Sequence, residues 1–402
     1  MSHSSQVTHI PTPLRASLIH AGLQNAGDTP SISLGRGTPG FFGPVASARV
    51  NDLTFSCGGT PDRYPNGVGD ENLRSLVARQ FSRVCGAAVQ ADELIITNGA
   101  TQALDLLFRE WGFRAGGRVN VAVLTPTWCV LPCNQIRLAG GRVLEIPSRR
   151  DATGWRIDMT AAETALQEAD MLFIVTPGNP TGSLCSHDLP LLLRLAFKRG
   201  VCCVLDLTYA EMIFDDRLPL DAGLLDDHRE QLYLVNSLSK TFGMPGVRVG
   251  ALVSPPRFCD GIAKVFEANV MGVANICQAI AVRALRQWEE TNGRWFDDVM
   301  VELRCRRQLT CETLERLGFS FDEPAAGYYV FAVPPTRLRL LGTSFAEKLN
   351  RAVGVTVVPG NDFDQSGEYG DYFRLSYANP TTMANLLDAM RRIEDFVVNN
   401  HF

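Results

Sequence analysis

The stretch SLSKTFGMPGVRVG, Ser237–Gly250, places a lysine between hydroxyl residues directly after an apolar run and follows it with glycines and an arginine. The chain has only four lysines, Lys198, Lys240, Lys264 and Lys348, and nearly all of its positive charge is arginine. A lysine amine can lose its proton and attack a carbonyl group, whereas arginine stays charged. The position of Lys240 therefore marks it as a candidate nucleophile.

Short apolar runs alternate with helix-like segments on both sides of this stretch, from Asp92 to about Pro256. Runs rich in β-branched residues that are separated by helices of about 10 to 15 residues predict βαβ units and a mainly parallel sheet. The runs are almost continuously hydrophobic, as is typical of strands with helices on both faces. The predicted strands cover residues 93–97, 119–126, 141–147, 170–177, 201–207, 231–237 and 248–254.

The pattern changes after Pro256. Long helical segments come first, over 257–270, 275–290 and 295–318, and short strands follow over 327–334, 355–360 and 372–378. This mixture predicts a second, smaller α+β unit, which we expect to be joined by a Gly-, Pro- and Ser-rich N-terminal arm. The expected division is residues 1–50 as the arm and part of the small domain, 51–287 as the large domain, and 288–402 as the small domain.

Composition narrows the class of protein. The 402 residues are 46% hydrophobic and 20% charged with a net charge of -5, which indicates a soluble globular chain without a nucleic-acid partner. No apolar stretch approaches the roughly 20 residues of a membrane helix, and the first residues, MSHSSQVTHIPTP, lack the blocks of a signal peptide. Eleven cysteines in scattered apolar contexts argue against disulfides, and no metal-ligand spacing is present. We therefore expect a cytoplasmic protein without a metal.

Polar side chains that follow the predicted strands are candidate site residues, because ligands of open α/β sheets bind beyond the carboxyl ends of the strands. The turn over 98–101 offers backbone amides and a hydroxyl group to a phosphate, although such a turn is more often a simple helix cap. Asp206 ends an apolar strand, where a carboxylate is costly without a cationic partner. The candidates are Gly99, Ala100, Thr101, Trp128, Asn179, Asp206, Tyr209, Ser237, Ser239, Lys240 and Arg248.

Together, these candidates match a flat pyridine ring that carries an aldehyde, a ring oxygen and a phosphate, which is pyridoxal 5'-phosphate. Lys240 would form a Schiff base with the aldehyde, and Asp206 would keep the ring nitrogen protonated. Asn179 and Tyr209 would hydrogen-bond the ring oxygen, while Trp128 would stack on the ring. The phosphate would be held in the turn at Gly99 by the Ala100 N–H, Thr101, Ser237, Ser239 and Arg248.

The motifs, in their order along the chain, resemble those of the pyridoxal-phosphate enzymes with the aspartate aminotransferase fold, fold type I, class I/II. The lysine stretch resembles the lysine signature of that family, TPGNPTG (176–182) its Asn-Pro-Thr-Gly loop, and DLTYAEMIF (206–214) its Asp-x-x-Tyr strand end. The resemblance implies an α/β fold, with a mainly parallel, seven-stranded-type sheet between helices and a smaller α+β domain.

The same resemblance implies substrate and partner contacts. SLGRGTPGF (33–41) is similar to the segment that brings Gly37 to the substrate carboxylate, and YFRLSYA (372–378) to the strand whose arginine, here Arg374, binds that carboxylate next to Asn179. RYPNGVGDENLR (63–74) is similar to the segment whose tyrosine, here Tyr64, reaches the phosphate of the partner subunit. The resemblance therefore implies a homodimer with shared active sites.

The chain also departs from the family pattern. Many relatives have Asp-Glu-x-Tyr where this chain has Asp-Leu-Thr-Tyr over 206–209, and Gly272–Ala274 stand where a hydroxyl residue often crosses to the other subunit. We can place no arginine that would bind the side-chain carboxylate of a dicarboxylic substrate, so an enzyme specific for aspartate or glutamate is not predicted. The pair Tyr328 and Tyr329 is interpreted as packing, with a role in lining the substrate site as the alternative.

The predicted activity is that of an amino-acid aminotransferase, with Lys240, Asp206 and Tyr209 as catalytic residues and the freed Lys240 as the base at Cα. The same residues serve other outcomes, so the alternative is elimination or replacement at Cγ, or carbon–carbon bond formation or cyclisation. The lysine stretch also resembles aminocyclopropane-carboxylate synthases, which act on S-adenosylmethionine. A non-enzymatic regulator is disfavoured, because the first 50 residues form no basic nucleic-acid-binding unit.

Overall fold

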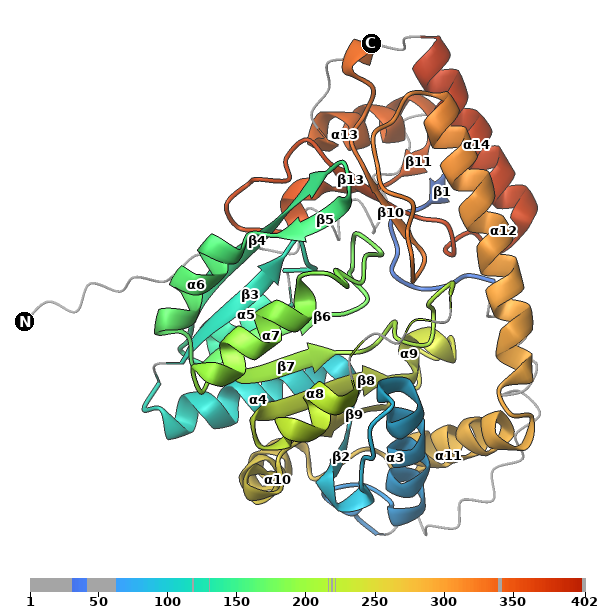
Figure 1. Ribbon diagram of the computed structural model, residues 1–402. Helices are drawn as coiled ribbons and strands as arrows, with labels where there is room; N and C mark the ends of the chain where they lie inside the picture. The colour runs from blue at the N-terminus through green and yellow to red at the C-terminus, as the bar shows by residue number, and fades with distance from the viewer. Residues whose placement is uncertain are drawn as a thin grey trace, which may run out of the picture.

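The computed structural model describes residues 31–41 and 63–399, except 118, 130, 216, 218–219, 221 and 339–341. Its largest element is an eight-stranded sheet, which lies beside a three-stranded and a two-stranded sheet in the described ranges (Figure 1). In spatial order the large sheet consists of β2 (Leu94–Thr97), β9 (Gly250–Val253), β8 (Leu232–Ser237), β7 (Cys202–Asp206), β6 (Met171–Val175), β3 (Asn120–Thr125), β4 (Arg142–Asp151) and β5 (Gly154–Ile157).

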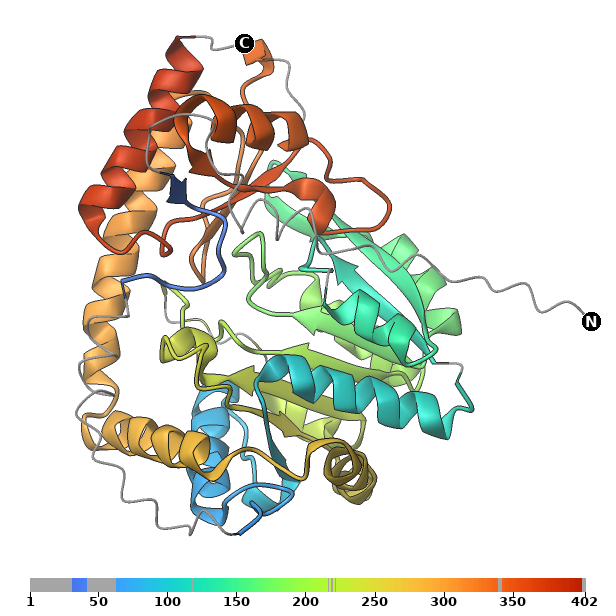
Figure 2. The ribbon, with the colours of Figure 1, turned by 180° about the vertical axis from the view of Figure 1, so that it is seen from behind.

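Helices cover both faces of the large sheet, which explains the continuous apolar runs of its strands. Strands β2, β8 and β9 are buried along their whole length. Helices α6 (Met159–Glu168) and α7 (Leu189–Lys198) pack on one face, and α4 (Ala100–Arg114), α5 (Pro132–Leu138) and α10 (Pro256–Val270) on the other (Figures 1 and 2). The remaining elements of this part are α3 (Glu71–Cys85), η1 (Ala91–Glu93), α8 (Ala222–Asp227), η2 (Arg229–Gln231), α9 (Leu238–Thr241) and α11 (Asn275–Glu290).

Strand direction brings the candidate residues to one edge of the sheet. The central strands β4, β3, β6, β7 and β8 are parallel, so residues that follow them emerge at the same edge. Strand β9 is antiparallel to both β8 and β2, and its first residue, Gly250, pairs with Ser237 and Thr97, the last residues of those strands. The chain that precedes Gly250 therefore lies at the same edge as the chain that follows Ser237 and Thr97.

The small sheet faces this edge from above (Figure 1). It is built from β10 (Tyr329–Ala332), β13 (Phe373–Ser376) and β12 (Val358–Pro359), with β13 in the middle. The N-terminal strand β1 (Ile32–Ser33) pairs in parallel with β11 (Val355–Thr356), so residues 31–41 join this part of the fold. The other elements are α12 (Arg294–Arg316), η3 (Thr336–Leu338), α13 (Gly342–Val353), η4 (Gly360–Asp362) and α14 (Met383–Val398).

The predicted α/β fold class is confirmed, and each of the seven predicted strands of the large sheet is present. The edge strand β5 was not predicted, because the segment from Ser148 to Ile157 is mostly polar and lacks an apolar run. It pairs antiparallel with the end of β4 across the turn after Asp151 and buries Trp155. The division of the chain at residue 288 stays a prediction, and residue 288 itself lies within α11. In the described residues no helix is long and apolar enough to cross a membrane.

Candidate active site

Lys240 lies where β8 ends and α9 begins. Ser237 caps this short helix, with its Oγ accepting from the Ser239 N–H at 3.1 Å, and this turn directs Lys240 across the edge of the sheet. The Nζ atom of Lys240 donates to the carbonyl oxygen of Gly37 in the N-terminal segment. Burial lowers the pKa of Lys240 below the ordinary lysine value, although the charge of nearby Asp206 acts against that shift. A larger fraction of its amine is therefore neutral and nucleophilic at a given pH.

Asp206 is the last residue of β7, and Thr208 holds one of its two carboxylate oxygens. The Thr208 N–H donates to Oδ1 of Asp206 at 3.0 Å, and the Thr208 hydroxyl donates to the same oxygen. Burial raises the pKa of Asp206, while the hydrogen bonds from Thr208 and the charge of Lys240 lower it. Thr208 fixes the carboxylate through Oδ1 and so leaves Oδ2 to face another partner.

Asn179 connects the large sheet to the small one. Its amide nitrogen donates to the hydroxyl oxygen of Tyr209 at 3.3 Å, and its amide oxygen accepts from Nη1 of Arg374 at 2.7 Å. The Tyr209 hydroxyl also lies 3.0 Å from the hydroxyl of Tyr329. Burial raises the pKa of Tyr209 well above the ordinary tyrosine value, and Tyr329 adds to this shift. Tyr209 is therefore a protonated phenol with a proton to donate.

Arg374 is buried in the middle strand of the small sheet and retains unused hydrogen-bonding capacity. Its Nη2 donates to the carbonyl oxygen of Gly35 at 2.8 Å, whereas Nε has no hydrogen-bond partner among the described residues. Aromatic rings surround the guanidinium, with its carbon 4.3 Å from the ring centre of Tyr329, 5.1 Å from Trp128 and 5.2 Å from Phe363. A buried guanidinium with an orphaned N–H is suited to a carboxylate.

A tight backbone cradle lies between the start of α4 and the lysine stretch. Gly99 has a φ of 80° and precedes α4 without a side-chain cap, so the first amides of the helix are open to an anion. A Cβ on Gly250 would lie 2.6 Å from the carbonyl carbon of Gly99 and 2.7 Å from the nitrogen of Ala100. Arg248 reaches over the cradle, with Nη2 donating to the carbonyl of Asn98 at 3.0 Å. The Oγ atoms of Ser237 and Ser239 are 2.7 Å apart beside it.

We predict that Gly250→Ala will weaken phosphate binding in this cradle by at least about tenfold and lower the stability of folding by roughly 1–3 kcal/mol, the usual effect of overpacking. The added Cβ would push the Gly99–Ala100 backbone away from residue 250. Cofactor titration and thermal melting measure the two effects. Gly246→Ala is the matched control in the same stretch, since a Cβ there meets nothing within 4 Å. Equal cofactor affinity of the two variants would contradict this prediction.

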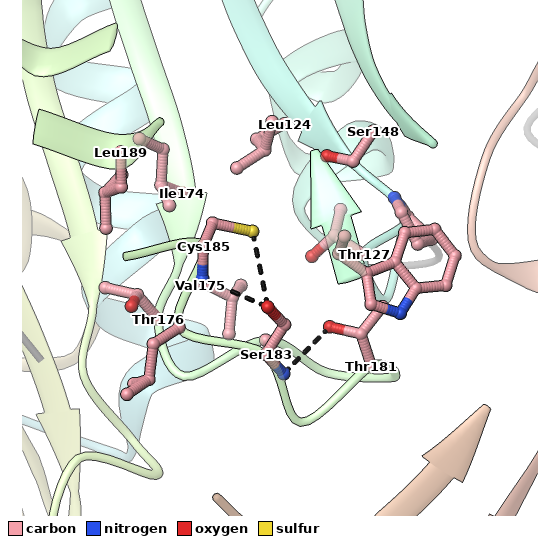
Figure 3. Close-up of a pocket in the computed structure, with 14 residues that line it drawn as sticks. Leu124, Thr127, Ser148, Ile174, Val175, Thr176, Thr181, Ser183, Cys185 and Leu189 are labelled. Atoms are coloured by element: carbon pink, nitrogen blue, oxygen red, sulfur yellow. Dashed lines mark hydrogen bonds between the residues drawn. The ribbon is translucent and has the colours of Figure 1, made fainter. Parts of the chain in front are cut away.

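The loop that carries Asn179 is stiffened by its own side chains. The Thr181 hydroxyl accepts from the Ser183 N–H at 3.2 Å, and the Ser183 hydroxyl accepts from the Cys185 N–H at 3.0 Å (Figure 3). Beside the loop lies a cavity of about 20 Å³, where the hydroxyls of Thr127 and Thr176 have no partner among the described residues. This volume suits one water molecule rather than a substrate. On the same loop, Asn179 faces Tyr209 and Arg374 instead.

The structure brings most of the predicted site residues to one edge of the large sheet. Gly37 and Arg374 join Lys240, Asp206, Tyr209 and Asn179 from the small-sheet side, and Trp128 is half-buried against Phe363 at a ring distance of 5.5 Å. Thr101 and Arg248 are exposed at the cradle. Tyr64 is 81% exposed, and no hydrogen bond or ring contact between described residues links it to this edge. The roles of all these residues stay predictions.

Sequence reasoning missed Thr208 as the partner of Asp206 and gave Tyr329 only a secondary role. A threonine two residues after an aspartate is a frequent turn signal, and this spacing could have identified the bond to Asp206. Tyr329 could not be recognised from the sequence, because its position depends on the register of β10 against β13. Its neighbour Tyr328 donates to the carbonyl oxygen of Gly37 at 3.0 Å, which the sequence also does not show.

Comparison with known proteins gives a consistent result over almost the whole chain. The chain is 28% identical to the aspartate aminotransferase of Thermotoga maritima over 91% of each chain, and 29% identical to aromatic-amino-acid aminotransferase 2 of Thermococcus litoralis over 90% of each. A solved double mutant of Thermus thermophilus aspartate aminotransferase superposes with a TM-score of 0.78 at 28% identity, covering 98% of this chain and 96% of the other. The profile of aminotransferase class I and II matches residues 31–393. The chain that folds around Lys240 thus belongs to the class I and II aminotransferase family.

Proposed function

We propose that the edge of the large sheet around Lys240 is the active site of this chain, which as a family member is a pyridoxal-5'-phosphate-dependent amino-acid aminotransferase. The observation that carries the site assignment is that a half-buried lysine, a half-buried aspartate and a buried arginine from two sheets lie close together, Lys240, Asp206 and Arg374. The comparisons confirm the predicted aminotransferase class and the cofactor, and they lend no support to the elimination or cyclisation alternative.

The residues present fit the cofactor. The uncapped start of α4 at Gly99 suits a phosphate, with Ala100, Thr101, Ser237, Ser239 and Arg248 around it. The second oxygen of Asp206 suits a ring N–H, and Tyr209 has a phenolic proton to donate to a ring oxygen. Trp128 supplies a flat face. When bound, the cofactor supplies an electron sink for the charge that develops at the substrate Cα.

The remaining steps are performed by side chains of the chain itself. Arg374 binds the substrate carboxylate with N–H groups that its bonds to Asn179 and Gly35 leave unused. Lys240, once its nitrogen is released, removes the proton from Cα and returns a proton during the reaction, and its lowered pKa leaves more of the amine neutral and able to act as a base. Asp206 keeps a negative charge beside the ring nitrogen.

The aromatic rings around Arg374 favour a substrate with a neutral side chain. The rings of Trp128, Tyr329 and Phe363 all lie within 5.2 Å of the guanidinium, so an aromatic or aliphatic side chain is better accommodated than a second carboxylate. One relative is named as an aromatic-amino-acid aminotransferase, although another is named for aspartate.

A half-reaction panel tests the proposed function. The protein loaded with cofactor is mixed with phenylalanine, tyrosine, leucine, aspartate or S-adenosylmethionine without any acceptor, and products are identified by mass. We expect about one equivalent of 2-oxo acid per site from the neutral amino acids and no released ammonia. Ammonia, or loss of a group from Cγ, would overturn the aminotransferase assignment, while a clear preference for aspartate would overturn the proposed substrate class.

A homodimer is part of the proposal and is supported by a patch of exposed apolar residues. Tyr64, Val270, Met271 and Ile276 are 81%, 42%, 48% and 44% exposed. The two segments that carry them touch, because the amide of Asn275 donates to the carbonyl of Arg63 at 3.4 Å. A contiguous exposed apolar patch is typical of an interface. The resemblance implies that Tyr64 reaches the phosphate of the partner subunit, and its exposure in one chain is consistent with that proposed role.

We predict that Met271→Asp will convert the dimer to a monomer and lower activity at least about tenfold, because a buried unpaired carboxylate is unfavourable at an interface. Sedimentation equilibrium measures the mass. Val301→Asp is the control, since Val301 is 59% exposed on α12, outside the patch. A wild-type monomer, or an M271D variant that remains dimeric, would contradict the proposed interface.

A cytoplasmic location also remains a proposal. It is supported by the ten cysteines in the described residues, all of which are free thiols, as is usual in a reducing compartment.

A further inference from the structure

We propose that Tyr329 is a positioning residue that supports both anchors of the site, Tyr209 through its hydroxyl and Arg374 through its ring. The inference rests on the proposed function, which gives these two residues their ligands. Tyr329 begins β10 in the small sheet and is 1% exposed. Tyr209 follows β7 in the large sheet, so Tyr329 reaches from one sheet to the other.

The hydroxyl of Tyr329 determines the direction of a hydrogen bond. Its oxygen lies 3.0 Å from that of Tyr209, and Asn179 donates to the same Tyr209 oxygen at 3.3 Å. A phenol has one proton and two lone pairs. If Tyr329 donates, both lone pairs of Tyr209 are occupied by Asn179 and Tyr329. The proton of Tyr209 is then available to the ring oxygen of the cofactor, and a donated hydrogen bond makes the phenol a stronger donor.

The ring of Tyr329 supports the substrate anchor. The guanidinium carbon of Arg374 lies 4.3 Å from its ring centre, closer than to the rings of Trp128 and Phe363 at 5.1 and 5.2 Å. The face of an aromatic ring attracts a cation, and more strongly away from water. The ring therefore holds Arg374 in place without using the N–H groups that a carboxylate needs.

The surroundings leave Tyr329 little freedom. Its backbone pairs with Ser376 in the small sheet, and its ring packs on Tyr328 at 4.7 Å. A Cβ on Gly37 would lie 2.7 Å from its hydroxyl oxygen, so the N-terminal segment closes over it. The titratable and charged groups near Tyr329 and Tyr209 are Lys240, Asp206, Arg374, Tyr328 and Tyr377.

Tyr329→Phe removes the hydroxyl group and keeps the ring, so it tests the role of the hydroxyl alone. We expect the pH midpoint of the visible absorbance change of the bound cofactor to move upward by about half a unit to one unit, the equivalent of one lost hydrogen bond. Tyr209 becomes a weaker donor, so the ring oxygen retains more negative charge and holds the proton on the Lys240 nitrogen more tightly. The KM for the amino acid should stay within about twofold, because the ring over Arg374 remains.

Tyr329→Leu removes both functions. We expect the same upward shift of the pH midpoint and, in addition, a rise in KM of about 3- to 30-fold, the range that corresponds to loss of one cation–π contact. Tyr372→Phe is the matched control, because Tyr372 lies next to β13 and stacks on Phe331 at 4.7 Å, without a ring contact to Tyr209 or Arg374 among the described residues. It should change neither the midpoint nor KM. Melting temperatures of all variants show whether each protein is folded.

Two results would overturn the inference. A Y329F midpoint within about 0.2 units of the wild type excludes the hydroxyl role, and a Y329L KM equal to that of the wild type excludes the ring role. A Y329L variant that fails to fold leaves Y329F to test the hydroxyl and Tyr329→Trp, which keeps an aromatic face, to test the ring. Failure of the proposed function is distinct, since the wild-type protein would then show neither the visible band nor a 2-oxo acid product.

Discussion

Replacing Lys240 by alanine is expected to reduce transamination by at least about 10⁴-fold, the upper end of the effect of removing a positioned base. The variant also loses the covalent attachment point, because the other three lysines of the chain stand in other segments. Folding should survive, since the carbonyl of Gly37 retains the hydrogen bond from Tyr328 at 3.0 Å. Steady-state turnover with the best amino acid of the panel measures the loss.

Borohydride reduction gives an independent measurement of the same variant. In the wild-type protein we expect a reduced cofactor on the peptide that contains Lys240, and none in K240A. The lowered pKa of Lys240 predicts that this labelling is selective at neutral pH and that selectivity falls as the pH rises to the ordinary lysine value. Lys264→Ala is the control, since Lys264 is an exposed residue of α10. Labelling of K240A equal to that of K264A would contradict the assignment.

Replacing Asp206 by asparagine is expected to lower kcat by about 10²–10³-fold, the usual cost of removing one preorganised electrostatic contact. The amide is nearly the same shape, and its oxygen still accepts the N–H of Thr208. Only the negative charge beside the ring nitrogen is lost, so the cofactor still attaches to Lys240 while the electron sink weakens.

Borohydride labelling and turnover should respond differently in D206N. Borohydride labelling should remain near the wild-type level while turnover falls, whereas K240A loses both. Asp105→Asn, which removes a negative charge from an ion pair with Arg109 on α4, serves as the control and should retain kcat. A kcat of D206N within about threefold of the wild type would show that the negative charge of Asp206 does not stabilise the ring nitrogen. That result would contradict the role assigned to Asp206.

Much of the large sheet could be predicted from sequence because its strands are continuous apolar runs that end in polar residues. The edge of the sheet at which Asp206, Ser237 and Asn179 gather follows from parallel strand direction alone. Arg248 reaches the same edge only because β9 is antiparallel, and the run from Arg248 to Ser254 carries no sign of its direction. The edge strand β5 was missed for the opposite reason, since its residues are mostly polar.

The small-sheet half of the site could not be derived from residue pattern. Arg374 was assigned by resemblance, and its position between Asn179 and Gly35 depends on packing between segments far apart in the sequence. Tyr329 is one of two adjacent tyrosines, and only the pairing of β10 with β13 distinguishes their environments. Such side chains are specified by tertiary contacts, which a local reading of the sequence does not contain.

The single amide of Asn179 has a thermodynamic consequence. Its oxygen is committed to a cation and its nitrogen to a phenol, so neither aspartate nor an aliphatic residue can satisfy both neighbours at once. A ligand that binds Arg374 therefore changes the hydrogen bonding of Tyr209. By linkage, a ligand that binds Tyr209 changes binding at Arg374 by the same free energy. The affinity of the enzyme for the substrate carboxylate is therefore expected to differ between the aldehyde and the amine form of its coenzyme.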